Sequence, residues 1–170
     1  MISLLILYEL NKKVYTMYGL SKQIKTDFSV ITLPSFGTIN PALKRMEEKG
    51  FIQSQKSMSK GGRPSVYYAI TNDGKKALKE ELLSPVSENP IQFLSVARTR
   101  LYCGSVLSKE ELKEMIKILK FKAEMIKVDT DKLIQNYEDS FFQRMVIDNL
   151  SLEYKNFISL LEEFSRACNS

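Results

Sequence analysis

Residues 35–49, SFGTINPALKRMEEK, carry side chains that suit the reading of base edges in duplex DNA. An Asn amide can pair with adenine, and Lys or Arg can donate hydrogen bonds to guanine. Asn40, Lys44 and Arg45 are of these types, and helical spacing separates them from the apolar side of the segment. That apolar stripe is expected to comprise Ile39, Ala42, Leu43 and Met46. The segment therefore favours a helix with one face in the core and another available to a major groove.

The start of this helix can be placed at either of two residues. Ser35 and Thr38 are both candidate N-caps, and either hydroxyl group could also bond a DNA phosphate. With Thr38 as the cap, Pro41 lies in the first turn, where its missing N–H costs little. With Ser35 as the cap, Pro41 removes one backbone hydrogen bond and the helix should kink. Gly50 is a suitable C-terminal stop.

A basic hairpin is expected directly after the helix. Residues 51–57 and 66–70 have strand patterns, and the loop 58–65 between them, MSKGGRPS, is basic and rich in glycine. Its glycines would let the backbone approach a phosphate ridge closely. Lys60 and Arg63 could bind phosphates there, and Arg63 could enter a narrow minor groove.

The remaining elements of the first half complete a known arrangement. Residues 2–10, 18–28 and 72–83 are predicted to be helices, and Thr71 is expected to cap the last of them. The second helix is expected to have an apolar stripe made of Leu20, Ile24 and Phe28, and Lys22 and Lys25 fall on its other side. The resulting order is helix, helix, helix, strand, basic loop, strand, helix, which is that of a winged helix-turn-helix. The predicted DNA-binding residues are Lys22, Lys25, Ser35, Gly37, Thr38, Asn40, Lys44, Arg45, Lys60, Arg63 and Tyr67.

The distribution of charge supports this prediction. Residues 1–83 contain 13 Lys and Arg and 7 Asp and Glu, a net charge of +6, whereas residues 84–170 contain 12 and 13, a net charge of −1. A positive excess confined to one half is expected when that half meets phosphates. For any single cation on the helix, a solvated surface position paired with a neighbouring Glu remains an alternative.

Enzymatic chemistry finds little support in the composition. The chain has no His and only two cysteines, Cys103 and Cys168, which lie in apolar helical stretches and are expected to be buried thiols. Neither a metal-ligand spacing nor a nucleophile–base pairing is visible. We therefore expect no catalytic residue, no metal site and no cofactor.

The residues of the helix and hairpin carry a family resemblance. SFGTINPALKRMEEKGFI and GGRPSVYYAITNDGKKAL resemble the paired motif of the PadR family of transcriptional regulators, and the resemblance covers residues 2–83. Asn40 stands where that family usually has Tyr, so the base preference should differ. Tyr18 and Leu20 replace a common His and an aromatic residue, so pocket chemistry at those positions is not carried over.

The second half is predicted to be entirely helical. After a linker at 84–92, helices are expected over 91–103, 109–139 and 141–167, with Ser108 and Glu111 forming a capping box. A heptad-like seam runs along the long helix from residue 112 to residue 137. We predict that residues 93–170 form a dimerisation domain, although packing within one chain is the alternative. The predicted dimerisation residues are Leu112, Ile116, Leu119, Ile126, Leu133, Phe157, Leu161 and Phe164.

The resemblance implies a homodimer on an inverted-repeat operator, acting as a repressor or less often as an activator. It also implies a small aromatic or cationic effector that releases DNA. Phe93, Tyr102, Phe121 and Tyr137 could line an apolar pocket, but core packing is the favoured role for each. A DNA-binding protein with no effector stays open, as does a winged-helix module that binds only proteins.

The opening segment does not predict a membrane protein. MISLLILYEL is too short to span a bilayer and lacks a basic leader and a cleavage pattern, so it is expected to be a core helix. A cytoplasmic location follows as the expectation.

Overall fold

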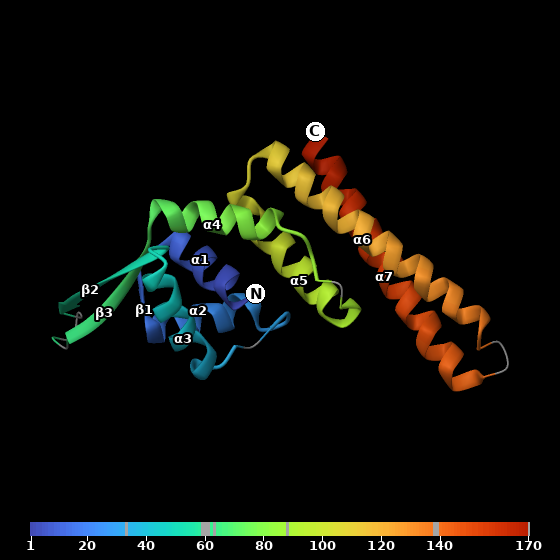
Figure 1. Cartoon of the computed structure of the whole chain (residues 1–170), viewed down its shortest axis with the longest axis horizontal. Coiled ribbons are helices and arrows are strands. Elements are labelled where there is room, and N and C mark those ends of the chain that lie inside the picture. Colours follow the sequence, from blue (N-terminus) through green and yellow to red (C-terminus); the bar gives the residue numbers. More distant parts are fainter. Residues whose placement is uncertain (33, 59–61, 63, 88, 138–139, 170) are drawn as a thin grey trace. The chain divides into compact units, whose positions relative to one another are not determined.

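The computed structural model describes residues 1–32, 34–58, 62, 64–87, 89–137 and 140–169, and gives no side chain for residue 36. The chain is mainly helical, with one small sheet (Figure 1). It divides into two compact units, residues 1–84 with 98–106, and residues 85–97 with 107–170. The elements in order are α1 (Ile2–Lys12), β1 (Tyr15–Thr16), α2 (Met17–Phe28), α3 (Phe36–Glu48), β2 (Ile52–Met58), β3 (Pro64–Ile70), α4 (Asn72–Leu83), α5 (Pro90–Cys103), a 3-10 turn (Gly104–Val106), α6 (Lys109–Gln135) and α7 (Phe141–Asn169).

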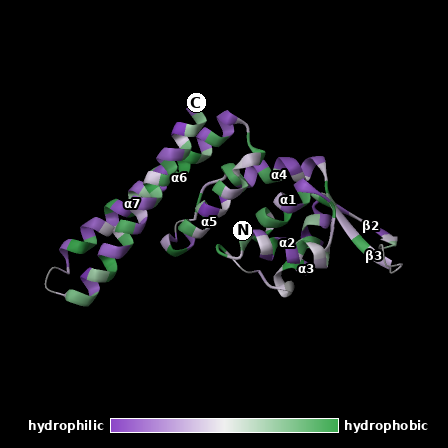
Figure 2. Ribbon diagram, turned by 180° about the vertical axis from the view of Figure 1, so that it is seen from behind, coloured by the Kyte–Doolittle hydropathy of each residue, from purple (hydrophilic) through white to green (hydrophobic). Residues whose placement is uncertain are grey.

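Helix α1 forms the centre of the first unit. Every residue from Leu4 to Leu10 is buried, because α1 packs against α2, α3, α4 and β3. The hydropathy colouring shows the apolar character of this helix (Figure 2). The prediction that the opening segment is a core helix is confirmed. No helix in the described part of the chain is long and apolar enough to cross a membrane.

Helices α2 and α3 each place one apolar stripe against this centre. The predicted stripe of α2, Leu20, Ile24 and Phe28, is fully buried. The predicted stripe of α3, which comprises Ile39, Ala42, Leu43 and Met46, is buried as well. The hydroxyl of Thr16 accepts a hydrogen bond from the Gly19 N–H and so caps the start of α2.

Three antiparallel strands form the sheet in the order β1-β3-β2. Strands β2 and β3 pair from Ile52–Ile70 to Met58–Pro64, as the predicted hairpin requires. The third strand, β1, was not predicted from the sequence; it has two residues and pairs only with Tyr67 and Tyr68.

Two glycines fix the turns around α3 and α4. Gly50 ends α3 with a φ of 71°, a left-handed conformation that side-chain-bearing residues rarely adopt. At Gly74, an added Cβ would lie 2.0 Å from the carbonyl oxygen of Phe51. The start of α4 therefore packs so closely against the backbone at Phe51 that only glycine fits at position 74. The Thr71 hydroxyl donates a hydrogen bond to the Gly50 carbonyl at 2.6 Å, which ties the same two segments together.

The second unit is built on the antiparallel pair of α6 and α7. The predicted capping box is confirmed, because Ser108 accepts from the Glu111 N–H and the Glu111 carboxylate accepts from the Ser108 N–H. Lys120 binds Glu162 at 2.8 Å across the two helices. Helix α6 ends at Gln135, four residues before the predicted end; residues 138–139 lie outside the described part.

Residues 90–97 of α5 belong to the core of the second unit. Phe93 is fully buried against the rings of Tyr154 and Phe157. The Tyr154 hydroxyl donates to the Pro90 carbonyl at 3.1 Å. Core packing of Phe93 is thus confirmed. Cys103 and Cys168 are buried free thiols, as expected.

Candidate nucleic-acid interface

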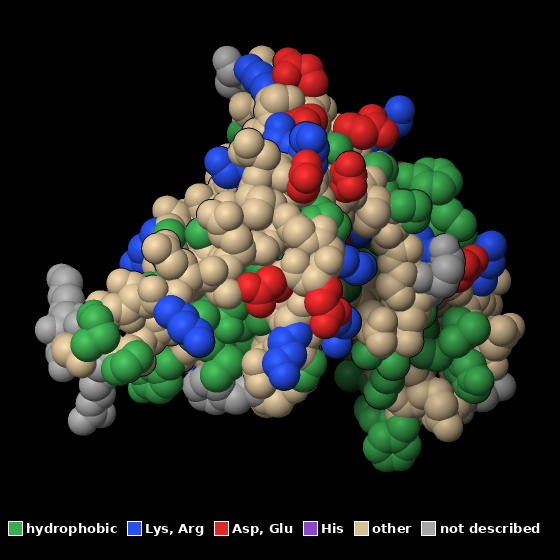
Figure 3. All heavy atoms as spheres, turned by 60° about the vertical axis from the view of Figure 1, so that its left-hand side comes forward, with side chains coloured by type: hydrophobic (Ala, Val, Ile, Leu, Met, Phe, Trp, Pro, Cys, Tyr) green, Lys and Arg blue, Asp and Glu red, His purple; other side chains and the backbone are tan. Residues whose placement is uncertain are grey.

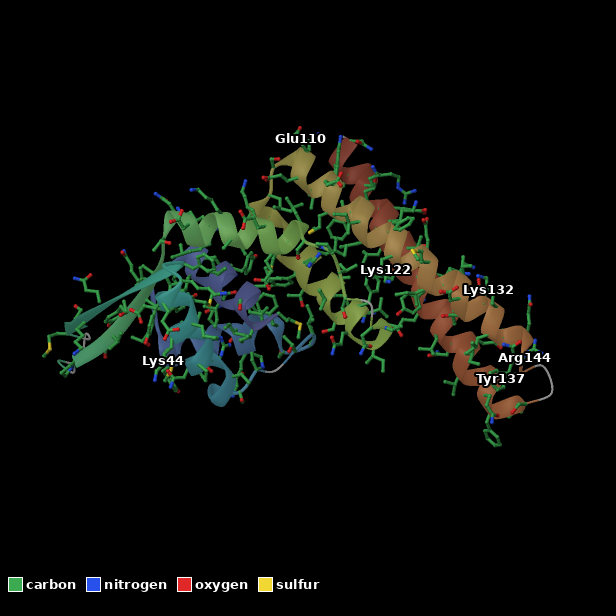
Figure 4. The ribbon with its side chains drawn as sticks, in the orientation of Figure 1. Lys44, Glu110, Lys122, Lys132, Tyr137 and Arg144 are labelled. Carbon is green, nitrogen blue, oxygen red and sulfur yellow. The ribbon has the colours of Figure 1, made fainter. Side chains whose placement is uncertain are left out.

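The outer face of α3 is free of contacts with the core of its unit. Gly37, Asn40, Pro41 and Lys44 are exposed on this face, opposite the buried stripe. The side chain of Lys44 points away from α1 (Figure 4). The face therefore presents an amide and an ammonium group to solvent. Both groups are of the kind that contacts base edges in the major groove of DNA.

The start of α3 settles the choice between the two candidate caps. Ser35 occupies the N-cap position, so the placement of the cap at Thr38 is wrong. The Ser35 side chain makes no capping hydrogen bond, and Thr38 donates its own hydroxyl to the Ser35 carbonyl at 2.8 Å. Pro41 lies inside the helix, where it cannot donate to the Gly37 carbonyl. The Ser35 hydroxyl and the first N–H groups of the helix are left available for an anion.

The wing is described only along its strands. Lys56 on β2 is exposed, whereas the predicted residues Lys60 and Arg63 lie outside the described residues. Tyr67 is half-buried in the middle of the sheet, in register with Gln55 on one side and Thr16 on the other. The wing strands also carry hydrophobic side chains at the surface (Figure 3), among them Met58.

A side-chain hydrogen bond joins α3 to the wing. The Ser54 hydroxyl on β2 donates a hydrogen bond to the Glu47 carboxylate on α3. Burial raises the pKa of the Tyr68 hydroxyl, and the same Glu47 charge raises it further. Glu47 was assigned no site role from the sequence, because its partner is seven residues away in another element. Its carboxylate links the C-terminal turn of α3 to the first wing strand.

The exposed cations of α2 lie at the edge of the same unit. Lys22 and Lys25 are both exposed, on the side of α2 away from its buried stripe. Arg45 leaves α3 on the flank opposite Glu47, towards α4. The structure thus places Asn40 and Lys44 on one face and Arg45 beside it.

A partly buried ionic cluster, formed by Glu9, Lys12 and Asp27, joins α1 to α2. Lys12 donates to Glu9 and to Asp27, each at 3.0 Å, and its ammonium lies 4.2 Å from the centre of the Tyr8 ring. Burial raises the pKa of Glu9, and Lys12 only partly offsets this. Burial alone would raise the pKa of Asp27, but its hydrogen bond with Lys12 lowers it. The cluster was not predicted, since two residues of α1 and one of α2 gave no sequence signal that they would meet.

Within the described residues, no group of three or more Cys, Asp or Glu side chains is placed to hold a metal ion. The functional groups that the first unit offers to a ligand are hydrogen-bond donors and cations. Three helices followed by a paired hairpin and a fourth helix make the first unit a winged helix-turn-helix.

Comparison with known proteins places this fold in a family. The model of the PadR-like family of transcriptional regulators matches residues 6–80. A PadR family transcription regulator from Clostridium difficile R20291 is 39% identical, with 46% of this chain and 79% of that chain covered and a TM-score of 0.42. The chain belongs to the PadR-like family of transcriptional regulators.

Two further matches span both units. Bacillus subtilis PadR in complex with operator DNA is 20% identical, with 98% of each chain covered and a TM-score of 0.46. The same protein in complex with p-coumaric acid is 21% identical, with 99% of this chain and 95% of that chain covered and a TM-score of 0.43. A search of curated protein sequences found no match.

Proposed function

We propose that this protein is a sequence-specific DNA-binding repressor that acts as a homodimer on an inverted-repeat operator. The observation that carries the proposal is the exposed face of α3, on which Asn40 and Lys44 stand beside a wing in a member of a regulator family. We propose no enzymatic activity and no cofactor for this protein. We propose that it acts in the cytoplasm.

The proposed mode of binding follows from this face. Helix α3 enters the major groove, where the Asn40 amide reads an adenine and Lys44 donates to a guanine. Lys22, Lys25 and Lys56 approach phosphates on either side, and the Ser35 hydroxyl at the start of α3 does the same. Gly37 and Thr38 in the first turn of α3 and Tyr67 on β3 complete the proposed DNA-binding set. Lys60 and Arg63 at the wing tip would add phosphate or minor-groove contacts.

Two-fold symmetry is proposed because one winged helix makes few phosphate contacts, and a second copy doubles them. Four predicted dimerisation residues, Ile116, Leu119, Phe157 and Leu161, are buried between α6 and α7 of one chain. The other four are half-buried or exposed: Leu112, Ile126, Leu133 and Phe164.

A second apolar stripe on α6 is available to a partner chain. Phe121, Met125 and Val128, spaced by four and three residues, are 65%, 45% and 51% exposed. At the far end of the helix pair, near Tyr137 and Arg144 in Figure 4, lies a shallow apolar hollow of about 360 Å³. Its lining residues are Leu133, Tyr137, Phe142, Gln143, Val146 and Ile147. Exposed apolar area of this extent supports association with a second copy.

The dimer is tested by sedimentation velocity on Phe121→Ser and Val128→Ser, with Lys113→Ser as an exposed control on the same helix. We expect each of the first two to raise the dimer dissociation constant at least about tenfold, because apolar anchors dominate interfaces. The control should leave it unchanged. A wild-type chain that is monomeric at high concentration would remove the dimer from the proposal.

DNA recognition is tested by selecting bound sequences from random duplexes, followed by fluorescence anisotropy. The proposal requires enriched sequences with two symmetric half-sites. A winged-helix module that binds only proteins is the second candidate, and it predicts no enrichment and no effect of Lys44→Ala. Repression is then read from a reporter gene placed behind the selected operator.

A small aromatic or cationic effector remains part of the proposal. Of the four aromatic residues considered for a pocket, Tyr102 belongs to a ring cluster with Tyr8 and Phe28 in the first unit. Phe121, Tyr102 and Tyr137 are exposed, at 65%, 45% and 39%, so none of the three is enclosed in the core of one chain. Release of DNA by an effector would follow if it favoured one dimer geometry over another.

A further inference from the structure

A groove in the first unit lies between α3 and α4, with α1 as its floor. Its volume is about 400 Å³, within the range of small-molecule sites. The apolar surface of the groove comes mainly from the half-buried side chains of Phe51 and Ala77. Leu7, Ala42 and Met46 close the floor beneath and are almost fully buried, with exposed fractions of 1%, 1% and 4%. All of its lining residues belong to one compact unit.

The two walls of the groove carry opposite charges. Arg45 in the last turn of α3 and Lys49, the C-cap residue of that helix, form the cationic wall. Glu80 and Glu81 on α4 form the anionic wall. Among the described residues, no ion pair joins the two walls. The Glu81 carboxylate instead accepts from the N-terminal amine at 3.4 Å. Opposite charges that face one gap without pairing leave room for a bridging molecule.

Hydroxyl groups mark the ends of the floor but leave it apolar. Ser84 is already engaged, because it donates to the Glu81 carbonyl and accepts from Arg100. The Lys49 ammonium lies 6.0 Å from the Phe51 ring centre, so the cationic wall also borders an aromatic surface. The groove thus has an apolar floor between a cationic wall and an anionic wall.

We propose that this groove binds a small zwitterionic molecule with an apolar body. Its anionic group, a carboxylate or phosphate, would meet Arg45 and Lys49, and its ammonium group would meet Glu80. Charge-assisted hydrogen bonds at both ends set the orientation, and the apolar floor takes the body of the molecule. Because Arg45 belongs to the proposed DNA-binding set, an occupied groove lowers the affinity for DNA; this regulatory part rests on the proposed function.

Binding is tested directly and without DNA, by isothermal titration of the full chain with linear ω-amino acids from 4-aminobutanoate to 11-aminoundecanoate. Octanoate and octylammonium serve as the matched single-charge probes for 8-aminooctanoate. We expect one chain length to bind best, and at least about tenfold tighter than either single-charge probe, since each loses one charged hydrogen-bond partner. Equal binding of all probes, or none, would overturn the proposal.

Matched variants locate the site. Lys49→Gln and Glu80→Gln should each weaken the best probe about tenfold, whereas Glu114→Gln, an exposed change of the same kind on α6, should not. Loss of binding in the control as well, or in none of the three, would place the probe elsewhere.

The regulatory arm uses the selected operator duplex. A saturating amount of the best ω-amino acid should weaken DNA binding by the wild type several-fold and leave binding by Glu80→Gln unchanged. If the probe binds in the groove but DNA affinity does not change, the regulatory part is overturned and the binding site stands. If no duplex is bound at all, the proposed function fails while the titration still decides the groove.

Discussion

The hydroxyl of Ser54 on β2 donates a hydrogen bond to the carboxylate of Glu47 on α3. This contact couples the helix proposed to read bases to the strand that carries Lys56. A reading helix and a wing can grip one duplex only if the angle between them is fixed, because a loosely held pair loses binding free energy in becoming ordered.

Removal of this contact should weaken DNA binding while the fold persists. Glu47→Ala and Ser54→Ala should each lower operator affinity about fivefold, the equivalent of one ordinary hydrogen bond of about 1 kcal/mol. Fluorescence anisotropy measures the affinity, and a thermal melt confirms the fold. Glu48→Ala is the control, because it removes the same charge from an exposed position in the same turn. Equal effects of Glu47→Ala and Glu48→Ala would show that only charge matters.

The elements that the sequence predicted correctly are those with strong local signals. The stripes of α2 and α3, the cap at Thr71 and the capping box at Ser108 each depend on residues within one or two turns. Strand β1 has no such signal, because two residues form a strand only through their pairing with β3.

In the candidate site, too, features with a local sequence signal could be predicted and features that depend on contacts between distant residues could not. Helical spacing is enough to place Asn40 and Lys44 opposite the core, so their exposure could be predicted. The contacts of Glu47 with Ser54 and of Lys12 with Asp27 join residues that meet only after folding, so residue types alone could not indicate them. The choice between Ser35 and Thr38 as the cap likewise depended on backbone geometry.

Gly74 should tolerate no side chain. In Gly74→Ala the new Cβ would lie 2.0 Å from the Phe51 carbonyl oxygen, so the backbone must move. We expect a loss of at least about 3 kcal/mol in the free energy of unfolding and a fall of roughly 10 °C in melting temperature. Gly37→Ala is the comparison, because its Cβ would lie 3.6 Å from the Ser35 hydroxyl oxygen, an ordinary contact. A similar melting temperature for the two variants would be incompatible with this packing.

The buried carboxyl of Glu9 should make stability depend on pH. Burial raises its pKa above the ordinary value of 4.5, so the folded state binds this proton more tightly than the unfolded state does. Its contribution is therefore fully present below pH 4.5 and is lost as the pH rises through the raised pKa. Asp27 has the opposite sign: its lowered pKa gives a contribution that is lost as the pH falls.

The substitution Glu9→Gln separates these two effects, since it keeps a carbonyl acceptor for Lys12 and removes the titrating proton. Urea unfolding from pH 4 to pH 8 should show that the variant gains stability relative to the wild type as the pH rises. A constant difference across this range would mean that Glu9 keeps its ordinary pKa in the folded protein.

Electrostatic contacts should appear in the salt dependence of DNA binding. Lys56→Gln should reduce the slope of log affinity against log salt concentration by about one, since one phosphate contact is lost, and weaken binding to all duplexes alike. Lys117→Gln, an exposed change on α6 in the second unit, should leave the slope unchanged. A slope that Lys56→Gln does not alter would exclude this residue from the interface.

The most direct test of the reading helix compares wild type and Asn40→Ala on the selected operator and on each of its single-base-pair variants, by anisotropy at one salt concentration. The account predicts that the wild type discriminates against replacement of one A·T pair in each half-site by about tenfold or more. Asn40→Ala should lose discrimination at that pair while keeping it at the others. An unchanged preference profile in Asn40→Ala, or a wild type that binds every duplex equally, would contradict the claim that α3 reads DNA sequence.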